Sequence, residues 1–269
     1  MQITLLIVFA VALTLTAAKI RHTLRFNEQV RNLFSQSKSI SGKSFSYQQL
    51  VGLPDPVQRY FKHVLQEGKA YISYVQLKHD GHFKPGLKKA WSRIKGEQYF
   101  TTEKPGFIWK GKTWLFTALD SYINCKGRLV VTILSLFKVV NAAGPHYNEG
   151  ELLRWLAESV WFPTNLLPCK ELEWTPIDNL SARLHYKYAG LAVSLVVNVN
   201  EKGEITEMKT TRYMNDEPAA WICKMYNYEA KHGYIIPTSA EALWRLEKGD
   251  FSYARFTIKT ISYNTTEVR

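Results

Sequence analysis

One apolar stretch with the period of a helix, residues 149–168, interrupts a chain whose other apolar segments alternate like β-strands. Five of its apolar side chains share one side of a helix: Leu152, Leu153, Leu156, Ala157 and Val160. Asn148 and Glu151 fit a capping box at the start, and Phe162 ends the helix because the residue before Pro163 resists the α conformation. Such a helix needs an apolar surface to cover, so we expect it to pack across a sheet.

The segments on either side of this helix predict the sheet. In residues 191–199 every second side chain is apolar, which is the pattern of a strand with one buried face. Comparable segments are residues 71–78, 91–102, 107–116, 128–140, 183–188, 205–213, 226–236 and 251–263. Roughly ten antiparallel strands with short connections form a meander, a sandwich or a barrel. The predicted fold class is therefore α+β, mainly antiparallel β, with a further short helix from Asp55 to Gly68.

The N-terminal residues predict a membrane anchor. Residues 3–18 carry no charge and are almost all apolar, and Lys19 and Arg21 follow them. A helix of about 18 residues measures roughly 27 Å, close to the ~30 Å hydrocarbon core of a bilayer. We predict that residues 1–18 form an uncleaved transmembrane helix, with a cleaved signal segment as the alternative. Residues 19–46 then predict a juxtamembrane helix and polar linker, and residues 47–269 a single β-rich domain.

Composition narrows the expected partners. The formal net charge of +12 favours contact with an anionic surface. The lysines and arginines are spread along the whole chain, and the predicted anchor places the protein at a bilayer. We therefore expect an anionic phospholipid surface, and not a nucleic acid, as the partner. The three cysteines have neither metal-binding nor disulfide spacing.

The polar side of the central helix carries the candidate site. Arg154 has Glu151 three residues before it and Glu158 four residues after it. These charges form either a solvated ladder worth about 0.2–0.5 kcal/mol per pair, or a buried triplet in a cleft beside Trp155. The candidate ligand-binding residues are Trp109, Glu151, Arg154, Trp155, Glu158 and Trp161. We assign no catalytic residue, metal ligand or cofactor, because the sequence holds no nucleotide loop, nucleophile elbow or zinc-protease motif.

Three segments resemble a known family. Residues 56–61 (Pro-Val-Gln-Arg-Tyr-Phe), residues 150–168 and Thr211-Arg212-Tyr213 resemble bacterial proteins, typically membrane-associated, that carry a domain of unknown function. The resemblance covers most of residues 50–265 and implies no activity. It implies a curved half-barrel similar to the lipoprotein-carrier group LolA/LolB, with helices on the concave side. It also points to a location outside the cell membrane, whereas the basic residues after the predicted span favour the cytoplasmic side. The side of the membrane therefore stays open.

Three functional hypotheses follow. The first is a membrane-anchored binding module, in which the central helix closes a half-barrel around an apolar or amphipathic, lipid-like ligand. The second is an enzyme that uses a charged cleft around Arg154, Glu151 and Glu158, where paired carboxylates near an arginine tune a pKa for acid–base chemistry. The third is a membrane-associated structural protein without a pocket.

Overall fold

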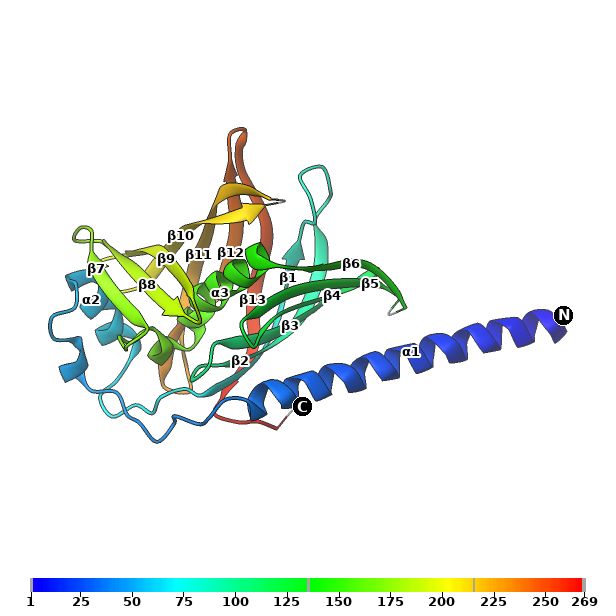
Figure 1. The fold of residues 1–269 in the computed structure, drawn as a ribbon, viewed down its shortest axis with the longest axis horizontal. Helices are drawn as coiled ribbons and strands as arrows, with labels where there is room; N and C mark the ends of the chain where they lie inside the picture. Colours follow the sequence, from blue (N-terminus) through cyan, green and yellow to red (C-terminus); the bar gives the residue numbers. More distant parts are fainter. Residues whose placement is uncertain (1, 135, 215, 268–269) are drawn as a thin grey trace.

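The computed structural model describes residues 2–134, 136–214 and 216–267, and within them the chain forms one sheet of thirteen strands (Figure 1). In chain order the strands are β1 (Tyr74–Phe83), β2 (Ser92–Thr101), β3 (Gly106–Lys112), β4 (Phe116–Ile123), β5 (Lys126–Ile133), β6 (Phe137–Ala143), β7 (Leu172–Pro176), β8 (Ser181–Tyr188), β9 (Leu191–Val199), β10 (Ile205–Met214), β11 (Glu217–Lys231), β12 (Tyr234–Leu246) and β13 (Gly249–Tyr263). Their spatial order is β6-β5-β4-β3-β2-β1-β13-β12-β11-β10-β9-β8-β7, and all neighbours are antiparallel.

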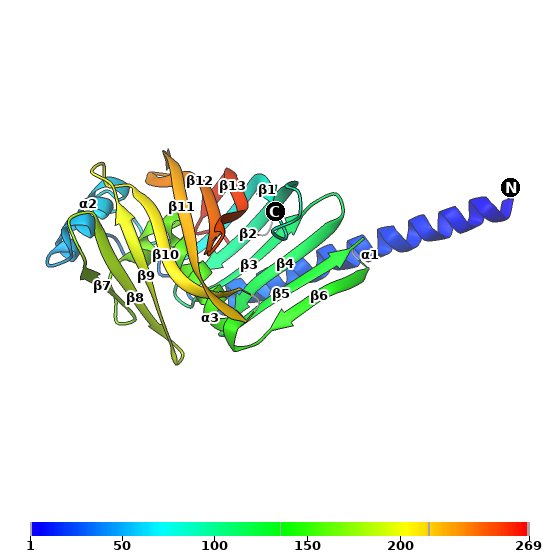
Figure 2. The same ribbon diagram turned by 90° about the horizontal axis from the view of Figure 1, so that it is seen from above.

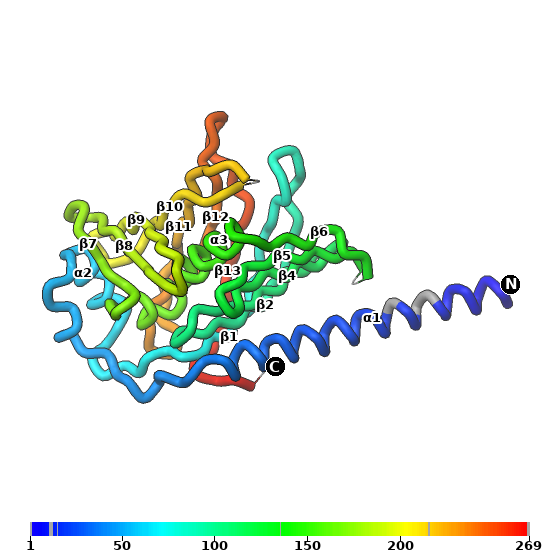
Figure 3. Tube along the Cα trace, viewed as in Figure 1, coloured from blue at the N-terminus to red at the C-terminus, as the bar shows by residue number. Residues whose placement is uncertain are grey.

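The sheet consists of two meanders, β1 to β6 and β7 to β13. They are joined at the centre by the pairing of β1 with β13, and the chain segment between β6 and β7 connects the two outer edges. β1 pairs with β13, so the first and last strands lie side by side at the centre, with Val75 opposite Tyr263. The edges are β6 and β7. Three helices carry the chain from one edge to the other: α3 (Pro145–Glu158) and the short 3₁₀ helices η2 (Ser159–Trp161) and η3 (Pro163–Leu166). The sheet curves around α3, and the bridging segment lies inside the curve (Figures 2 and 3).

The main core fills the space between α3 and the inner face of the sheet. α3 is buried on most sides because the sheet wraps around it: Leu152, Leu156 and Trp155 are all at most 1% exposed. The helix therefore packs across the sheet as the sequence predicts. The short helices α2 (Asp55–Val64) and η1 (Tyr47–Leu50) extend the core at one end, with Tyr60 and Phe61 buried.

A second, smaller core lies on the outer face. The long helix α1 (Gln2–Ser35) runs along the convex side of the sheet, and its N-terminal half projects beyond the edge strands (Figures 1 and 2). Its C-terminal turns pack on β2 and β3 through these buried side chains: Phe26, Val30, Leu33 and Phe34 of the helix with Tyr99 and Ile108 of the strands. Both faces of the sheet are therefore covered at β2 and β3.

The predicted class, a curved and mainly antiparallel sheet with a covering helix, agrees with this architecture, but the predicted number of roughly ten strands is too low. Hairpin turns inside two of the predicted strands explain part of the difference. Residues 128–140, taken as one strand, form the β5–β6 hairpin, and Leu134 beside its turn has a φ of 53°. Residues 226–236 likewise span the β11–β12 turn at His232-Gly233. Strands β4 and β7 fall in residues where no strand was predicted.

The predicted transmembrane helix requires a correction. Among the residues that the structure describes, no helix has both the length and the apolar character needed to span a bilayer. The predicted single-pass membrane localisation is therefore wrong. Helix α1 continues without a break through Lys19, Arg21 and Arg25 to Ser35, where it is docked on the sheet. The division into segments 1–18, 19–46 and 47–269 stays a prediction, and residues 1, 268 and 269 lie outside the described part of the chain.

The start of α3 also differs from the predicted capping box. The helix begins at Pro145, and Gly144 before it has a φ of 136°, which favours glycine. Asn148 lies inside the first turn, and its side-chain oxygen accepts a hydrogen bond from the backbone N–H of Gly127 on β5, at 2.8 Å. The asparagine therefore fixes the helix to the sheet instead of capping it.

Truncating a core residue of α3 tests the packing of the bridge. Leu156→Ala should lower the free energy of unfolding by about 2–5 kcal/mol, because the side chain is fully buried and the vacated space cannot collapse between helix and sheet. Urea unfolding followed by tryptophan fluorescence measures the change. Leu180→Ala, at a half-exposed loop position, is the control and should change stability by less than about 0.5 kcal/mol.

Candidate functional site

A cavity of about 870 Å³ lies between the end of α3 and the inner face of the sheet. Strands from both meanders form its walls, with β3 to β6 on one side and β10 to β13 on the other. The walls are largely apolar, and they include Phe116, Leu129, Val131, Val140, Met225 and Phe256. The polar residues Asp120, Arg154, Glu158 and Arg212 also line the cavity, where α3 meets the strands. The cavity therefore combines a large apolar surface with a charged region on one side.

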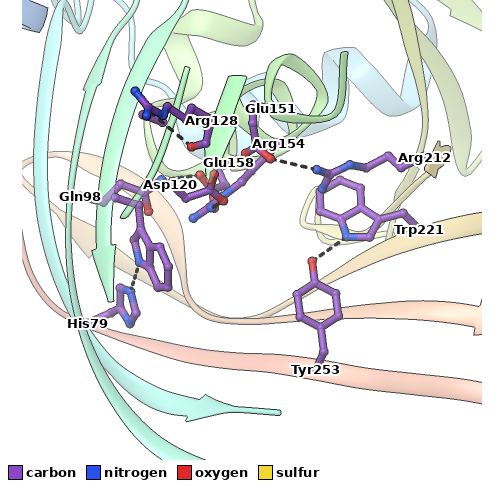
Figure 4. Close-up of polar contacts among 12 residues, drawn as sticks. His79, Gln98, Asp120, Arg128, Glu151, Arg154, Glu158, Arg212, Trp221 and Tyr253 are labelled. Atoms are coloured by element: carbon purple, nitrogen blue, oxygen red, sulfur yellow. Dashed lines mark hydrogen bonds and ion pairs between the residues drawn. The ribbon is translucent and has the colours of Figure 1, made fainter. Parts of the chain in front are cut away.

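Arg154 is the centre of the charged region (Figure 4). Its Nη1 lies 2.6 Å from Oδ2 of Asp120 on β4, and its Nε lies 2.9 Å from Oε1 of Glu158 on the next turn of α3. Gln98 on β2 donates a hydrogen bond of 2.6 Å to the other oxygen of Glu158. The guanidinium also lies 5.1 Å from the ring centre of Trp109. All three charged side chains are at least 86% buried, so this network is part of the interior.

A second ion pair lies beside the first. Nη2 of Arg212 on β10 is 3.4 Å from Oε1 of Glu151, and its guanidinium lies 4.4 Å from the ring centre of Trp221 on β11. Trp221 in turn donates a hydrogen bond of 2.9 Å to the hydroxyl of Tyr253. Figure 4 shows these groups opposite the Arg154 network. Two arginines from different halves of the fold thus share three carboxyl groups.

Burial determines the charge of these groups. Loss of hydration, together with the neighbouring Asp120 carboxylate, raises the pKa of Glu151 to about 8. Burial also raises the pKa of Asp120 and of Glu158, although Arg154 opposes the shift in both. Burial alone would lower the pKa of Arg154, but the surrounding carboxylates outweigh it and raise the value. The shift favours the protonated form of Glu151 at neutral pH, while Arg154 favours the ionised forms of Asp120 and Glu158.

Several polar atoms of this region have no hydrogen-bond partner among the described residues. They are Oδ1 of Asp120, Oε2 of Glu151 and Nε of Arg212. An unpaired buried polar atom costs about 1–3 kcal/mol, so a group that supplies the missing bonds is stabilised there. Two of the three side chains, Asp120 and Arg212, line the cavity. The unpaired atoms themselves are closed to solvent, so a bound molecule reaches them only if these side chains move.

Trp109 is oriented by a buried histidine. Its Nε1 donates a hydrogen bond of 2.8 Å to Nε2 of His79 on β1, as Figure 4 shows. Burial lowers the pKa of His79 to about 4, so the ring is neutral and accepts this bond. The described residues contain no group of three or more His, Cys, Asp and Glu side chains placed to hold a metal ion.

The six predicted site residues separate into two sets. Arg154, Glu158, Trp109 and Trp161 line the cavity. Trp155 and Glu151 do not: the indole N–H of Trp155 donates to the Thr101 carbonyl at 2.9 Å. The charges form a buried group and not the solvated ladder, but Glu151 pairs with Arg212 instead of Arg154. Binding of a ligand by these residues stays a prediction.

Three residues of the charged region, Asp120, Arg212 and Gln98, are not among the six site residues predicted from the sequence. Asp120 alternates with Ala118 and Tyr122 on the inward face of β4, so the period of two could have indicated a buried carboxylate. No strand was predicted there. Arg212 belongs to the quoted Thr-Arg-Tyr segment, but its pairing with Glu151 depends on the crossing of α3 over β10, which local patterns do not reveal.

Comparison with known proteins identifies the family. Residues 43–256 match the family of unknown function DUF6544. The chain belongs to this family. No curated protein matches the sequence. Among solved structures the chain is similar to the LolA superfamily protein NE2245 from Nitrosomonas europaea, with a TM-score of 0.36 and 10% identity over 78% of this chain and 92% of that chain. The predicted membership of a family without an assigned activity is confirmed.

Glu151 gives the stability of the fold a pH dependence. The folded-state pKa of Glu151 is about 8, which lies above its ordinary value of 4.5. Protonation of this carboxyl group therefore stabilises the fold fully below pH 4.5, and that stabilisation is lost as the pH rises through 8. Glu151→Gln stays neutral throughout. The variant should match the wild type near pH 5 and be more stable at pH 9, by on the order of 3 kcal/mol. Urea unfolding of both proteins at both pH values measures this difference, and parallel pH profiles would contradict it.

Proposed function

We propose that the protein is a binding module for an amphipathic, lipid-like ligand, held in the cavity between α3 and the sheet. The observation that carries the proposal is the cavity of about 870 Å³, which has apolar walls and a charged region on one side. Its volume lies within the range of roughly 300–1,000 Å³ typical of small-molecule sites. The presence of this cavity does not support the alternative of a structural protein without a pocket.

The charged region favours a ligand with a neutral hydrogen-bonding group. In this proposal Glu151 is protonated and Asp120 and Glu158 are ionised beside Arg154, so two carboxylates balance the two arginines. A ligand with a full charge would disturb this balance in a buried place, at a high cost in free energy. A hydroxyl or an amide instead both donates and accepts hydrogen bonds, and it adds no charge beside the Asp120 and Arg212 side chains that line the cavity. The apolar walls take the hydrocarbon part of the same molecule.

The rim of the cavity supports entry of an apolar molecule. The β3–β4 and β5–β6 hairpins turn at the same end of the sheet, and they expose Trp114 (87%), Phe137 (64%) and Leu134 (56%) to solvent. Leu115 and Val140, close to these tips, line the cavity itself. Exposed apolar groups that continue into a cavity are typical of a binding surface. In this proposal Lys138, exposed beside the tips, meets the anionic phospholipid surface from which the ligand is taken.

The proposal is tested by identifying what the full-length protein carries. Purified protein is extracted with organic solvent, and the extract is analysed by mass spectrometry beside that of a buffer blank and an unrelated protein from the same cells. We expect an amphipathic compound enriched in the sample, and displacement of a fluorescent fatty acid by that compound. A protein that yields no such compound and binds no fluorescent fatty acid would refute the proposal.

A second candidate function is an enzyme that uses the buried carboxyl groups as proton donors or acceptors. The raised pKa of Glu151, about 8, favours it, because a carboxyl group that ionises near neutral pH suits acid–base catalysis, and burial also raises the pKa of Asp120 and of Glu158. The two functions differ in the fate of the ligand. Incubation of the extracted compound with Asp120→Asn and wild-type protein separates them: a binding module leaves it chemically unchanged with both, whereas an enzyme converts it with the wild type only.

A further inference from the structure

A second cavity lies on the outer face of the sheet, beneath α1. Its volume is about 510 Å³, and it is lined by Lys19, His22 and Thr23 of the helix and by residues of β13 and β1 to β4. It shares no lining residue with the inner cavity. The sheet therefore separates two chemically different cavities, one on each face.

The outer cavity is strongly basic. Its lining includes six lysines: Lys19, Lys78, Lys95, Lys110, Lys112 and Lys259. The carboxylates in the lining are Asp80 and Glu97, which leaves a surplus of four positive charges. The charges come from four neighbouring strands (β13, β1, β2 and β3) and from α1, so the fold collects them in one place although they are dispersed in the sequence. A concave surface with charge of one sign concentrates ions of the opposite sign.

Most of these lysines have no protein counter-ion. Lys110 forms an ion pair with Glu97 and lies 3.7 Å from the ring centre of Phe26. The other five are exposed, and none of them forms an ion pair with a described residue. Lys95 and Lys112 are direct partners across β2 and β3. Like charges opposite each other destabilise a sheet, so an anion between them removes a repulsion that the protein itself leaves in place.

The pKa of His22 reflects the positive electrostatic potential within this cavity. Burial lowers its pKa, and the charges of Lys110, Arg25 and Lys112 lower it further. The ring therefore resists taking up a proton at the point where α1 faces the lysines. A bound anion would reverse this effect, which gives the site a spectroscopic reporter that does not depend on any activity.

We propose that the outer cavity is a binding site for a multiply charged phosphate group, carried either by a lipid headgroup or by a free phosphate compound. Lysine ammonium groups bind phosphate as mobile point charges, and five unpaired ones surround this cavity. The cavity is open enough for the phosphate to keep part of its hydration. The site is independent of the ligand proposed for the inner cavity.

The test uses full-length protein and inorganic pyrophosphate. We expect saturable binding by calorimetry, weakened by added salt, and a rise in the pKa of His22 followed by NMR of its ring protons. The double variant Lys95→Gln and Lys112→Gln should bind at least about tenfold more weakly, equivalent to about 1.4 kcal/mol. The variant should fold at least as stably as the wild type, because it loses a repulsive pair.

A charge-matched control separates a site from a general charge effect. Lys202→Gln with Lys248→Gln removes the same charge from two exposed lysines in the β9–β10 and β12–β13 turns, outside the cavity lining. This control should bind pyrophosphate like the wild type. Equal weakening in both double variants, or no shift of the His22 pKa at saturation, would overturn the proposal.

The source of the phosphate is resolved with vesicles. Sedimentation is measured with phosphatidylcholine vesicles, with and without phosphatidic acid. Binding that requires phosphatidic acid and is lost in the Lys95/Lys112 variant indicates a lipid headgroup. Binding of pyrophosphate without binding to either vesicle indicates a free phosphate compound. Failure of both pyrophosphate and phosphatidic acid to bind refutes the site, whatever the inner cavity is found to hold.

Discussion

Arg154→Met should lower the free energy of unfolding by about 3–5 kcal/mol at pH 8, which is the cost of leaving buried charges without their partner. Arg154 contacts Asp120 at 2.6 Å and Glu158 at 2.9 Å, and all three side chains are largely buried. Without the guanidinium both carboxylates lose their main compensation for lost hydration. The loss should be smaller at pH 5 than at pH 8, because burial raises the pKa of both carboxyl groups and protonation at lower pH removes uncompensated charge. Urea unfolding at both pH values measures the effect.

Two controls test whether the loss of stability in Arg154→Met arises from buried charges without a partner. Arg245→Met removes an arginine from the exposed pair with Asp250, in which the side chains are 50% and 39% accessible, and should cost at most about 1 kcal/mol. Adding Asp120→Asn and Glu158→Gln to Arg154→Met should restore most of the stability, because no uncompensated charge is left. A triple variant no more stable than Arg154→Met would show that packing of the arginine side chain, and not charge, holds the helix on the sheet.

The sequence predicts the local features of this fold well. Alternation in residues 191–199 places Val193, Leu195 and Val197 on the inner face, and all three are buried there. The apolar period of the central helix predicts that it covers a sheet, because only a sheet offers a large enough apolar partner. Where turns lie inside apolar runs, as beside Leu134, the sequence fails, since a residue with positive φ need not be glycine.

The candidate site depends on contacts that no local pattern contains. Arg154 and Glu158 are neighbours on α3, so their pairing follows from helical spacing. Asp120 on β4 pairs with Arg154, and Arg212 on β10 pairs with Glu151; these strands lie on opposite halves of the sheet, and the two pairs meet only because α3 bridges its edges. The sequence could not decide between a solvated ladder and a buried group, because that choice depends on which strands face the helix.

Filling the inner cavity should abolish ligand binding while the protein stays folded. Ala242 on β12 lines the cavity, and its cross-strand partners Cys223 and Ala254 are small, so a larger side chain at position 242 extends into free volume. Ala242→Trp should weaken binding of a fluorescent fatty acid by at least about tenfold, or about 1.4 kcal/mol, because the indole occupies the space of the hydrocarbon chain. Ala242→Leu should give an intermediate loss. Equilibrium titration of the fluorescence measures both.

A matched tryptophan distinguishes a filled cavity from a damaged sheet. Ala230 lies on the adjacent strand β11, is exposed and is not part of the cavity lining, so Ala230→Trp places the same side chain in solvent. It should bind the fatty acid like the wild type, and circular dichroism should show the same β content in both variants. Undiminished binding by folded Ala242→Trp would mean that the ligand lies elsewhere. Since Asp120 and Arg154 line the same cavity as Ala242, such a result would leave the charged region without a ligand to orient and would favour a purely structural role for its ion pairs.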